Sequence, residues 1–233
     1  MHKEEFKEAL KKLEIDLTDE QLSKLDIYYK MLIHYNSNVN LTRITDEKEV
    51  YLKHFYDSLT LAKAIKLDNQ TLLDVGTGAG FPGMVLKIVF PNLKVTLVDA
   101  LNKRILFLNS VIEKLKLKEI KAIHARAEEF ATTNKESFDI VTSRAVASLN
   151  ILSELCLPMV IVGGSFIPMK ANAENEIILS EKAIQTLGGV IKETIIFELP
   201  YNAGTRTLIN IKKIDKTSNK YPRKFSEIKK KPL

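Results

Sequence analysis

Residues 72–83 have the sequence Leu-Leu-Asp-Val-Gly-Thr-Gly-Ala-Gly-Phe-Pro-Gly. An apolar run leads to Asp74, glycines follow at positions 76, 78 and 80, and the apolar residues 84–90 have helical character. Glycine allows positive φ and close approach of a ligand to the backbone, and a helix N-terminus presents free N–H groups. The stretch therefore predicts a strand, a ligand-holding turn and a helix. Alone, it also fits an ordinary tight turn or a dinucleotide fingerprint that begins at Gly78.

Asp99 indicates which ligand the turn holds. It ends a second strand-like run, 93–98, and lies sixteen residues after Gly83. In a doubly wound sheet the ends of the first two parallel strands are neighbours, so an acidic residue there can accept hydrogen bonds from both hydroxyls of a ribose. A cofactor that contains a nucleoside is therefore expected.

The composition is that of a globular chain. Its 233 residues are 45% hydrophobic, enough for one α/β domain and a modest extension. The single cysteine, Cys156, excludes an internal disulfide framework, and the four histidines have no metal-ligand spacing. The longest apolar stretch, 151–169, is broken by Glu154, Pro158 and two glycines, which favours a helix and a strand over a membrane span. We expect a cytoplasmic monomer with no structural metal and no signal peptide.

Basic residues gather at the C-terminus. Residues 212–233 contain nine basic and two acidic side chains, a net charge of +7, whereas the whole chain carries +6. A basic tail on a nearly neutral body predicts contact with a polyanion, nucleic acid first. The alternative is a tail that lysine merely keeps in solution.

The order of elements predicts an α/β, Rossmann-like fold in three parts: a helical N-terminal extension over 1–67, a main domain over 68–213 and a basic tail over 214–233. The extension includes a capping box at Thr18 and Gln21. No helix separates the last two strands, which predicts an antiparallel hairpin at one edge of a mostly parallel seven-stranded sheet. The expected strands are 71–75, 94–99, 120–124, 138–142, 165–170, 190–198 and 206–213, and the helices between them are 80–89, 101–115, 125–130, 148–157 and 174–187.

The asparagine-rich segment 34–44 is predicted to be a turn between two helices. Its polar residues either cap helices and hold the loop or, at Asn40, Thr42 and Arg43, line a substrate cleft. A further helix is expected from about residue 46 to residue 61. On it, His54 and Asp57 either face the cofactor or have a structural role.

Several motifs together carry a resemblance to a known family. They are the glycine stretch 74–83, the Asp99 strand end, Ala-Glu-Glu-Phe at 127–130, Ser-Arg-Ala-Val-Ala-Ser-Leu at 143–149, Gly-Thr-Arg at 204–206 and Tyr-Pro-Arg-Lys at 221–224. With these motifs the chain resembles the glucose-inhibited division protein B family over nearly its whole length. The resemblance implies a class I S-adenosylmethionine-dependent methyltransferase that modifies N7 of a guanosine in small-subunit (16S) rRNA. The tail departs from the family pattern, because Ser226 and Ile228 stand where glycine and proline are usual.

Four predicted strand ends carry polar or glycine residues and should converge on one crevice. The resemblance implies cofactor contacts there at Gly76, Phe81, Ala127, Glu128 and Arg144. Gly76 allows main-chain approach, Asp99 suits the ribose, and Ala127 with Glu128 can offer an N–H and a carboxylate to adenine. Phe81 either covers an apolar part of the cofactor or packs the first turn of its helix. The complete expected set of cofactor-binding residues is Asp74, Gly76, Gly78, Phe81, Asp99, Ala127, Glu128 and Arg144.

Arg144 is the expected catalytic residue, as a hydrogen-bond donor where the cofactor and the target base meet. The competing role is an ion pair with a nearby acid such as Glu128 or Asp74. Guanine N7 already has a lone pair, so methyl transfer needs alignment and no general base. Cys156 lies between two leucines and is interpreted as a core residue, not a nucleophile.

Two other classes of function remain open from the sequence. A nucleotide-cofactor oxidoreductase would use the fingerprint that begins at Gly78, although Asp74 and the Ala-Glu turn at 127–128 argue against it. A noncatalytic RNA-binding module would keep the cofactor pocket without methyl transfer.

Overall fold

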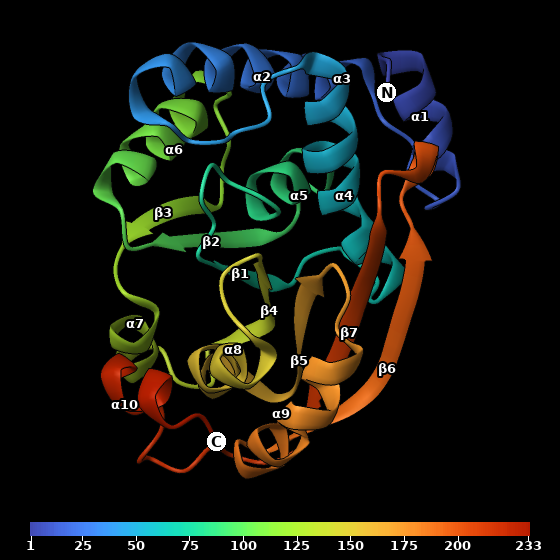
Figure 1. Cartoon of the computed structure of the whole chain (residues 1–233). Coiled ribbons are helices and arrows are strands. Elements are labelled where there is room, and N and C mark those ends of the chain that lie inside the picture. Colours follow the sequence, from blue (N-terminus) through green and yellow to red (C-terminus); the bar gives the residue numbers. More distant parts are fainter.

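The computed structural model describes residues 1–233, apart from the side chain of Asn38. In this part of the chain seven strands form one sheet in the order β3-β2-β1-β4-β5-β7-β6 (Figure 1). The pairs among β1 to β5 are parallel, and β7 is antiparallel to both β5 and β6, as predicted. The strands are β1 (Thr71–Val75), β2 (Lys94–Asp99), β3 (Ile120–His124), β4 (Phe138–Arg144), β5 (Val160–Lys170), β6 (Gly189–Glu198) and β7 (Thr205–Lys213).

The two faces of the sheet belong to two hydrophobic cores. Because side chains alternate along a strand, Leu72 lies in one core and Leu73 in the other, and Ile140 and Val141 divide in the same way. The edge strand β6 is largely exposed, whereas β1 and β2 are almost continuously buried. The central strands are therefore apolar on both faces, as expected for parallel strands covered by helices.

Different parts of the chain cover the two faces (Figure 1). The N-terminal helices share the first core with α5 and α6, while α7, α8, α9 and the C-terminal tail contribute to the second. The helices outside the N-terminal region are α5 (Gly83–Val89), α6 (Asn102–Lys114), α7 (Ala127–Thr133), α8 (Leu149–Cys156), α9 (Glu174–Thr186) and α10 (Phe225–Lys230), with short 3-10 segments η3 (Leu157–Met159) and η4 (Pro200–Asn202).

The N-terminal region begins with α1 (Lys3–Lys11) and α2 (Asp19–Val39). The predicted capping box is confirmed: Gln21 N–H donates to Thr18 Oγ1 at 3.2 Å, and Thr18 N–H donates to Gln21 Oε1 at 2.9 Å. The predicted turn over 34–44 is wrong in its first half, because α2 continues to Val39. The helix ends at Asn40, which adopts the left-handed conformation. The side chain of Asn36 accepts from Thr42 N–H at 2.8 Å, so it holds the chain beyond the helix rather than breaking it.

The expected helix over 46–61 is a continuous run of helical turns with changing hydrogen-bond patterns. Asp46 caps α3 (Glu47–Val50), which passes into the π-helical segment η1 (Tyr51–Tyr56), then α4 (Asp57–Leu59) and the 3-10 segment η2 (Thr60–Lys63). π-Helical insertions are frequent at functional sites because they turn the following side chains about the helix axis. His54 lies within this insertion and Asp57 directly follows it.

The C-terminal tail packs on the body of the molecule. Buried Lys213, the last residue of β7, donates to Leu157 O at 2.8 Å and to Thr217 Oγ1 of the tail at 2.6 Å. Tyr221 and Ile228 are buried in the second core, so a position that departs from the family pattern is an anchor. Lysines 229–231 are exposed. In the described residues, no helix has the length and apolarity needed to cross a membrane.

Tyr28 links the N-terminal helices to the glycine turn. Its fully buried ring contacts Phe55, Phe81 and Phe107 at centroid distances of 5.6, 5.6 and 6.3 Å, and its hydroxyl donates to Ala79 O. Tyr28→Phe should keep the ring packing and lose the buried hydrogen bond. We expect the free energy of unfolding in urea to fall by about 1–3 kcal/mol.

The neighbouring Tyr29 is the matched control. Its hydroxyl donates to Thr45 O at 3.3 Å near the surface, so Tyr29→Phe should change stability by less than about 0.5 kcal/mol. Equal effects of the two substitutions would show that the bond to Ala79 contributes nothing specific.

Candidate active site

Two buried carboxylates hold the glycine turn. Asp74 Oδ2 accepts from Thr77 Oγ1 at 2.7 Å and from Gly83 N–H at 2.8 Å, and Asp99 Oδ2 accepts from Gly78 N–H at 2.9 Å. Gly76 N–H also donates to Val98 O at 2.8 Å. The turn is therefore fixed from beneath by strand ends, with its backbone placed before any ligand arrives.

Two glycines of the turn have different surroundings. Gly78 has φ +62° and open space where a Cβ would stand. Gly76 has φ +69°, and a Cβ there would fall 2.5 Å from Val146 Cγ2. Positive φ explains the residue type at both positions. In addition, Gly78 leaves room beside the backbone, and Gly76 lets the loop after β4 lie on the turn.

A small cavity of about 150 Å³ lies at the carboxyl ends of β1, β2 and β3. Of the predicted cofactor residues, Gly76, Asp99, Ala127 and Glu128 line this small cavity, so the structure brings these four together. The other lining residues are Val75, Val98, Ala100, Ala125, Arg126, Val146, Leu155 and Phe225.

The acidic groups of the small cavity already have cationic partners. Asp99 is 3% exposed and accepts from Arg104 Nη1 at 3.0 Å and from Leu101 N–H at 2.9 Å. Arg126 Nε donates to Glu128 Oε1 at 2.8 Å. A ligand that uses these carboxylates therefore joins existing hydrogen-bond networks.

Asp74 does not line the small cavity. It is fully buried beneath the turn, and its Oδ1 is a buried oxygen without a hydrogen-bond partner among the described residues. Burial raises the pKa of this carboxyl to about 6. Asp74 therefore supports the turn through Oδ2, while its Oδ1 makes no hydrogen bond in the part of the chain that the structure describes.

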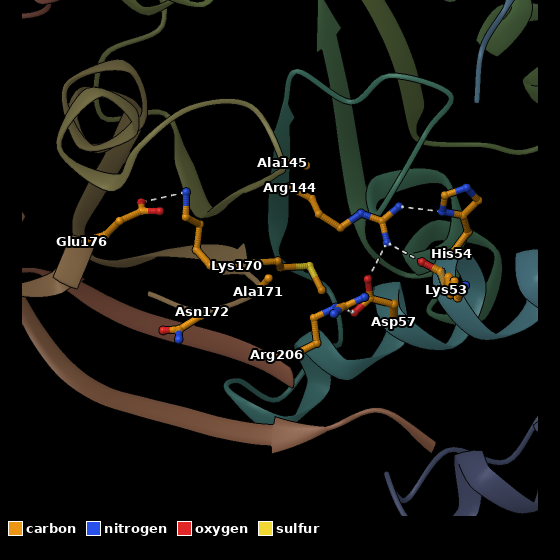
Figure 2. Close-up of a pocket in the computed structure, with 11 residues that line it drawn as sticks. Lys53, His54, Asp57, Arg144, Ala145, Lys170, Ala171, Asn172, Glu176 and Arg206 are labelled. Atoms are coloured by element: carbon orange, nitrogen blue, oxygen red, sulfur yellow. Dashed lines mark hydrogen bonds and ion pairs between the residues drawn. The ribbon is translucent and has the colours of Figure 1, made fainter. Parts of the chain in front are cut away.

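A larger cavity of about 470 Å³ lies at the ends of β4, β5 and β7, beside η1 (Figure 2). Four basic and two acidic side chains line it, which gives it a net positive charge, and its size is typical of a small-molecule site. Its lining residues are Lys53, His54, Asp57, Arg144, Ala145, Met169, Lys170, Ala171, Asn172, Glu176 and Arg206.

Arg144 points from the end of β4 toward the N-terminal helices (Figure 2). Its Nη1 donates to Asp57 Oδ2 at 3.0 Å and to Lys53 O at 3.3 Å, and its Nη2 donates to His54 Nδ1 at 3.3 Å. The guanidinium carbon lies 5.3 Å from the centre of the Phe81 ring. The expected acidic partners, Glu128 and Asp74, were wrong: the acid that pairs with Arg144 is Asp57.

Asp57 is shared by two arginines. It is 3% exposed, and its second oxygen accepts from Arg206 Nε at 2.9 Å. One carboxylate therefore orients two partly exposed guanidinium groups, and the cluster keeps a net positive charge. The sequence placed Asp57 and Arg206 far apart, and no local pattern indicates their contact.

His54 is a neutral link in this network. Its ring stacks on Phe81 with centroids 4.4 Å apart and planes 15° apart. Because Arg144 can only donate, His54 Nδ1 must accept, so its Nε2–H donates to Thr42 Oγ1 at 3.0 Å. Burial, followed by the charge of Arg144, lowers the pKa of His54 to about 3.

These contacts answer two alternatives left open by the sequence. Thr42 supports His54 and lies outside both cavities, and exposed Arg43 lies outside them too. Phe81 is 6% exposed and packs between Tyr28 and His54, where it supports the network beneath Arg144. Cys156 is fully buried, which confirms its interpretation as a core residue.

The loop after β4 is the common wall of the two cavities. Ala145, with φ +56°, lines the larger cavity, and Val146 lines the small one. Lys170 fastens this loop by donating to Ala147 O at 2.7 Å, and it pairs with Glu176 at 2.9 Å. The positions where a cofactor and a substrate could bind are therefore adjacent.

The sequence reasoning missed Phe225 of the small cavity and Lys170 and Arg206 of the larger one. Lys170 could have been predicted, because it is the last residue of a predicted strand and ligands of parallel sheets bind at such strand ends. Arg206 stood in the quoted Gly-Thr-Arg motif, and Phe225 directly follows the Tyr-Pro-Arg-Lys motif.

Comparisons with known proteins agree with this geometry. Residues 21–201 match the family model described as GidB, rRNA small subunit methyltransferase G. The chain is 51% identical to the Ribosomal RNA small subunit methyltransferase G of Levilactobacillus brevis over 240 residues, which cover 100% of this chain and 99% of that protein. It is 50% identical to the protein of the same name from Staphylococcus carnosus over 231 residues, 97% of this chain and 96% of that one.

The fold also resembles solved structures. One is M. jannaschii TYW2 in complex with AdoMet, with a TM-score of 0.54 and 16% identity over 65% of this chain and 72% of that one. At this identity the likeness is one of fold, and it supports the predicted Rossmann-like sheet.

The low pKa of His54 predicts a dependence of stability on pH. The folded pKa is about 3 and the ordinary value is 6.5, so the unfolded chain binds the extra proton between these values. The contribution of neutral His54 is complete above pH 6.5 and is lost as pH falls toward 3. His54→Gln removes this term. As pH falls below 6.5, the free energy of unfolding of the wild type should therefore fall relative to that of the variant, by up to about 1.4 kcal/mol per pH unit.

Urea unfolding of both proteins at several pH values between 7 and 5 is the measurement. Comparing the difference between the two proteins cancels the opposite contribution of Asp74, whose raised pKa favours the folded state as pH falls below 6. A difference that stays constant over this range would contradict a neutral, buried His54.

Proposed function

Because the chain belongs to the rRNA small subunit methyltransferase G family, we propose that it transfers a methyl group from S-adenosylmethionine to N7 of a guanosine in small-subunit (16S) rRNA. The observation that carries this proposal is the pair of adjacent cavities, one lined by carboxylates and glycine backbone and one basic, with the loop that begins at Arg144 between them. The comparisons support a methyltransferase and give no support to the oxidoreductase or the noncatalytic module. An rRNA substrate favours a cytoplasmic location.

The residues around the small cavity fit a nucleoside cofactor. Asp99 and Glu128 supply acceptors for ribose hydroxyls and an adenine amino group. Gly78 does not line this cavity, but the open space beside it leaves the backbone of the turn accessible to a ligand. Asp74 would act from beneath the turn, because it holds Thr77 Oγ1 and Gly83 N–H in place. S-adenosylmethionine bound there would supply a methyl group on a sulfonium.

The larger cavity is the proposed site of the target base. An enzyme that modifies a base takes it out of the stack into a pocket, and a volume of about 470 Å³ suits that role. Lys53, Lys170 and Arg206 line this cavity and each pairs with an acidic side chain. Four basic side chains against two acidic ones still leave the lining with a net positive charge, which favours neighbouring phosphates. The cavity and its charge thus match a flipped nucleotide.

Arg144 is proposed to orient that base. Within the described residues, three of its five N–H groups have acceptors, which leaves two for a ligand. Donation to guanine O6 would fix the ring while N7 keeps its lone pair free for the methyl group. His54 is neutral and accepts from Arg144, so it is no proton acceptor for the reaction, and N7 requires none. Alignment is the main contribution of the protein.

The decisive experiment measures transfer of radiolabelled methyl from S-adenosylmethionine to unmodified small-subunit rRNA, followed by nucleoside analysis. We expect 7-methylguanosine at one position. Arg144→Ala should lower the rate of transfer by about 100-fold or more, as expected for loss of a group that aligns the substrate. Its fold should survive, because Asp57 keeps Arg206 as a partner.

Binding of S-adenosylhomocysteine, measured by calorimetry, is the control for Arg144→Ala and should stay near the wild-type value, because the guanidinium lines the other cavity. Unchanged methyl transfer in this variant would remove Arg144 from the mechanism. Another methylated nucleoside in the product would replace the proposed target atom.

The exposed lysines of the tail are proposed to contact rRNA phosphates. Replacing Lys229, Lys230 and Lys231 by glutamine should weaken RNA binding and reduce the slope of log affinity against log salt by about 2–3. A matched variant replaces Lys11, Lys12 and Lys30, which are exposed on the N-terminal helices. Equal losses in both variants would show that the tail is no preferred RNA surface.

A further inference from the structure

We propose that Phe225 of the C-terminal tail forms one wall of the cofactor site and that the ion pair between Glu154 and Arg223 holds it there. This inference rests on the proposed function, which places the cofactor in the small cavity. It assigns the tail a second role, because its aromatic side chain belongs to the cofactor site while its lysines face outward.

Phe225 is the contribution of the tail to the small cavity. It lines that space together with Gly76, Asp99 and Glu128, which come from elements far earlier in the chain. The guanidinium of Arg126 lies over the Phe225 ring, 5.6 Å from its centre, and pairs with Glu128. The ring, the cation and the carboxylate thus form one contiguous side of the cavity.

A buried ion pair holds the segment of the tail that leads to Phe225. Glu154 of α8 is 0% exposed, and its Oε1 accepts from Arg223 Nε at 2.8 Å and from Arg223 N–H at 2.9 Å. Its Oε2 accepts from Arg223 Nη2 at 2.5 Å. A buried carboxylate needs such multiple partners, and these hydrogen bonds allow the tail one position. Phe225 follows two residues later.

The same helix serves the cavity directly. Leu155, next to Glu154, lines the small cavity, so α8 contributes to the lining and also anchors the segment that brings Phe225 there. Ile228, one turn beyond Phe225 in α10, is 0% exposed and fixes the helix against the second core. Figure 1 shows α10 beside α7, whose first residues are Ala127 and Glu128. The position of Phe225 is thus fixed on both sides along the chain.

The chemistry that Phe225 offers is an aromatic face or edge for a purine. Stacking of a base on an aromatic side chain is worth about 1–3 kcal/mol by alanine substitution, which corresponds to roughly 5- to 150-fold in affinity. Phe225→Ala should therefore weaken binding of S-adenosylhomocysteine by about tenfold in calorimetry. Phe225→Tyr keeps the ring and should bind within about twofold of wild type.

The chain contains no tryptophan, so one introduced residue reports on its own surroundings. The emission of Phe225→Trp should change when S-adenosylhomocysteine binds. Tyr201→Trp is the control, because Tyr201 is 62% exposed and lies at the β6–β7 hairpin, outside both cavities. Its emission should stay constant in the same titration.

The anchor is tested by the uncharged pair Glu154→Gln with Arg223→Gln, which avoids leaving one buried charge alone. In the Phe225→Trp protein this double change should reduce both the emission change and the affinity for S-adenosylhomocysteine at least fivefold. Circular dichroism at the titration temperature checks that each variant is folded.

The outcomes separate the two proposals. One outcome is that wild type and Phe225→Ala bind S-adenosylhomocysteine equally well and that the emission of Phe225→Trp does not change. The role of Phe225 is then refuted, and the proposed function stands. If folded wild type binds no S-adenosylhomocysteine, the cofactor assignment fails and the role of Phe225 fails with it. Equal emission changes at positions 225 and 201 would also refute the inference, because they would reflect a change of the whole molecule.

Discussion

The architecture of the site depends on carboxylates that accept hydrogen bonds from the backbone of the glycine turn. Asp74 and Asp99 lie at the carboxyl ends of adjacent strands, as the penultimate and the last residue, and accept hydrogen bonds from Gly83 N–H and Gly78 N–H. A turn rich in glycine has high conformational freedom when unfolded, so its fixed shape requires such buried acceptors. The shape of this turn determines where the two cavities, the loop after β4 and Phe81 lie.

The N-terminal helices are part of the site rather than a cover over it. They supply Tyr28 beneath the turn and both His54 and Asp57 beside Arg144. Asp57 gives Arg144 and Arg206 a common orientation, which neither strand provides alone. The parallel sheet thus positions one cavity with its own strand ends, whereas the other is completed by a separate region of the chain.

Local sequence patterns predicted the seven strands and four of the residues that line the small cavity, but not Phe225. The bounds of β1, β2 and β3 were predicted, and Gly76, Asp99, Ala127 and Glu128 meet because parallel strand ends share one edge. The pairing of Asp57 with Arg206 spans 149 residues and leaves no periodic signal. The helix over 34–39 was missed because its polar residues favour turns in isolation, while packing of the long helix α2 overrides that preference.

The order of strands also has a consequence for synthesis of the protein. β7 is the last strand to leave the ribosome, yet it lies between β5 and β6 in the sheet. β6 therefore has no neighbour in the sheet until β7 has emerged, and two residues of the second core, Tyr221 and Ile228, follow β7 in the chain. The edges of β5 and β6 that pair with β7 stay open until β7 emerges, so the sheet is completed by a late strand rather than by the emergence of the glycine turn.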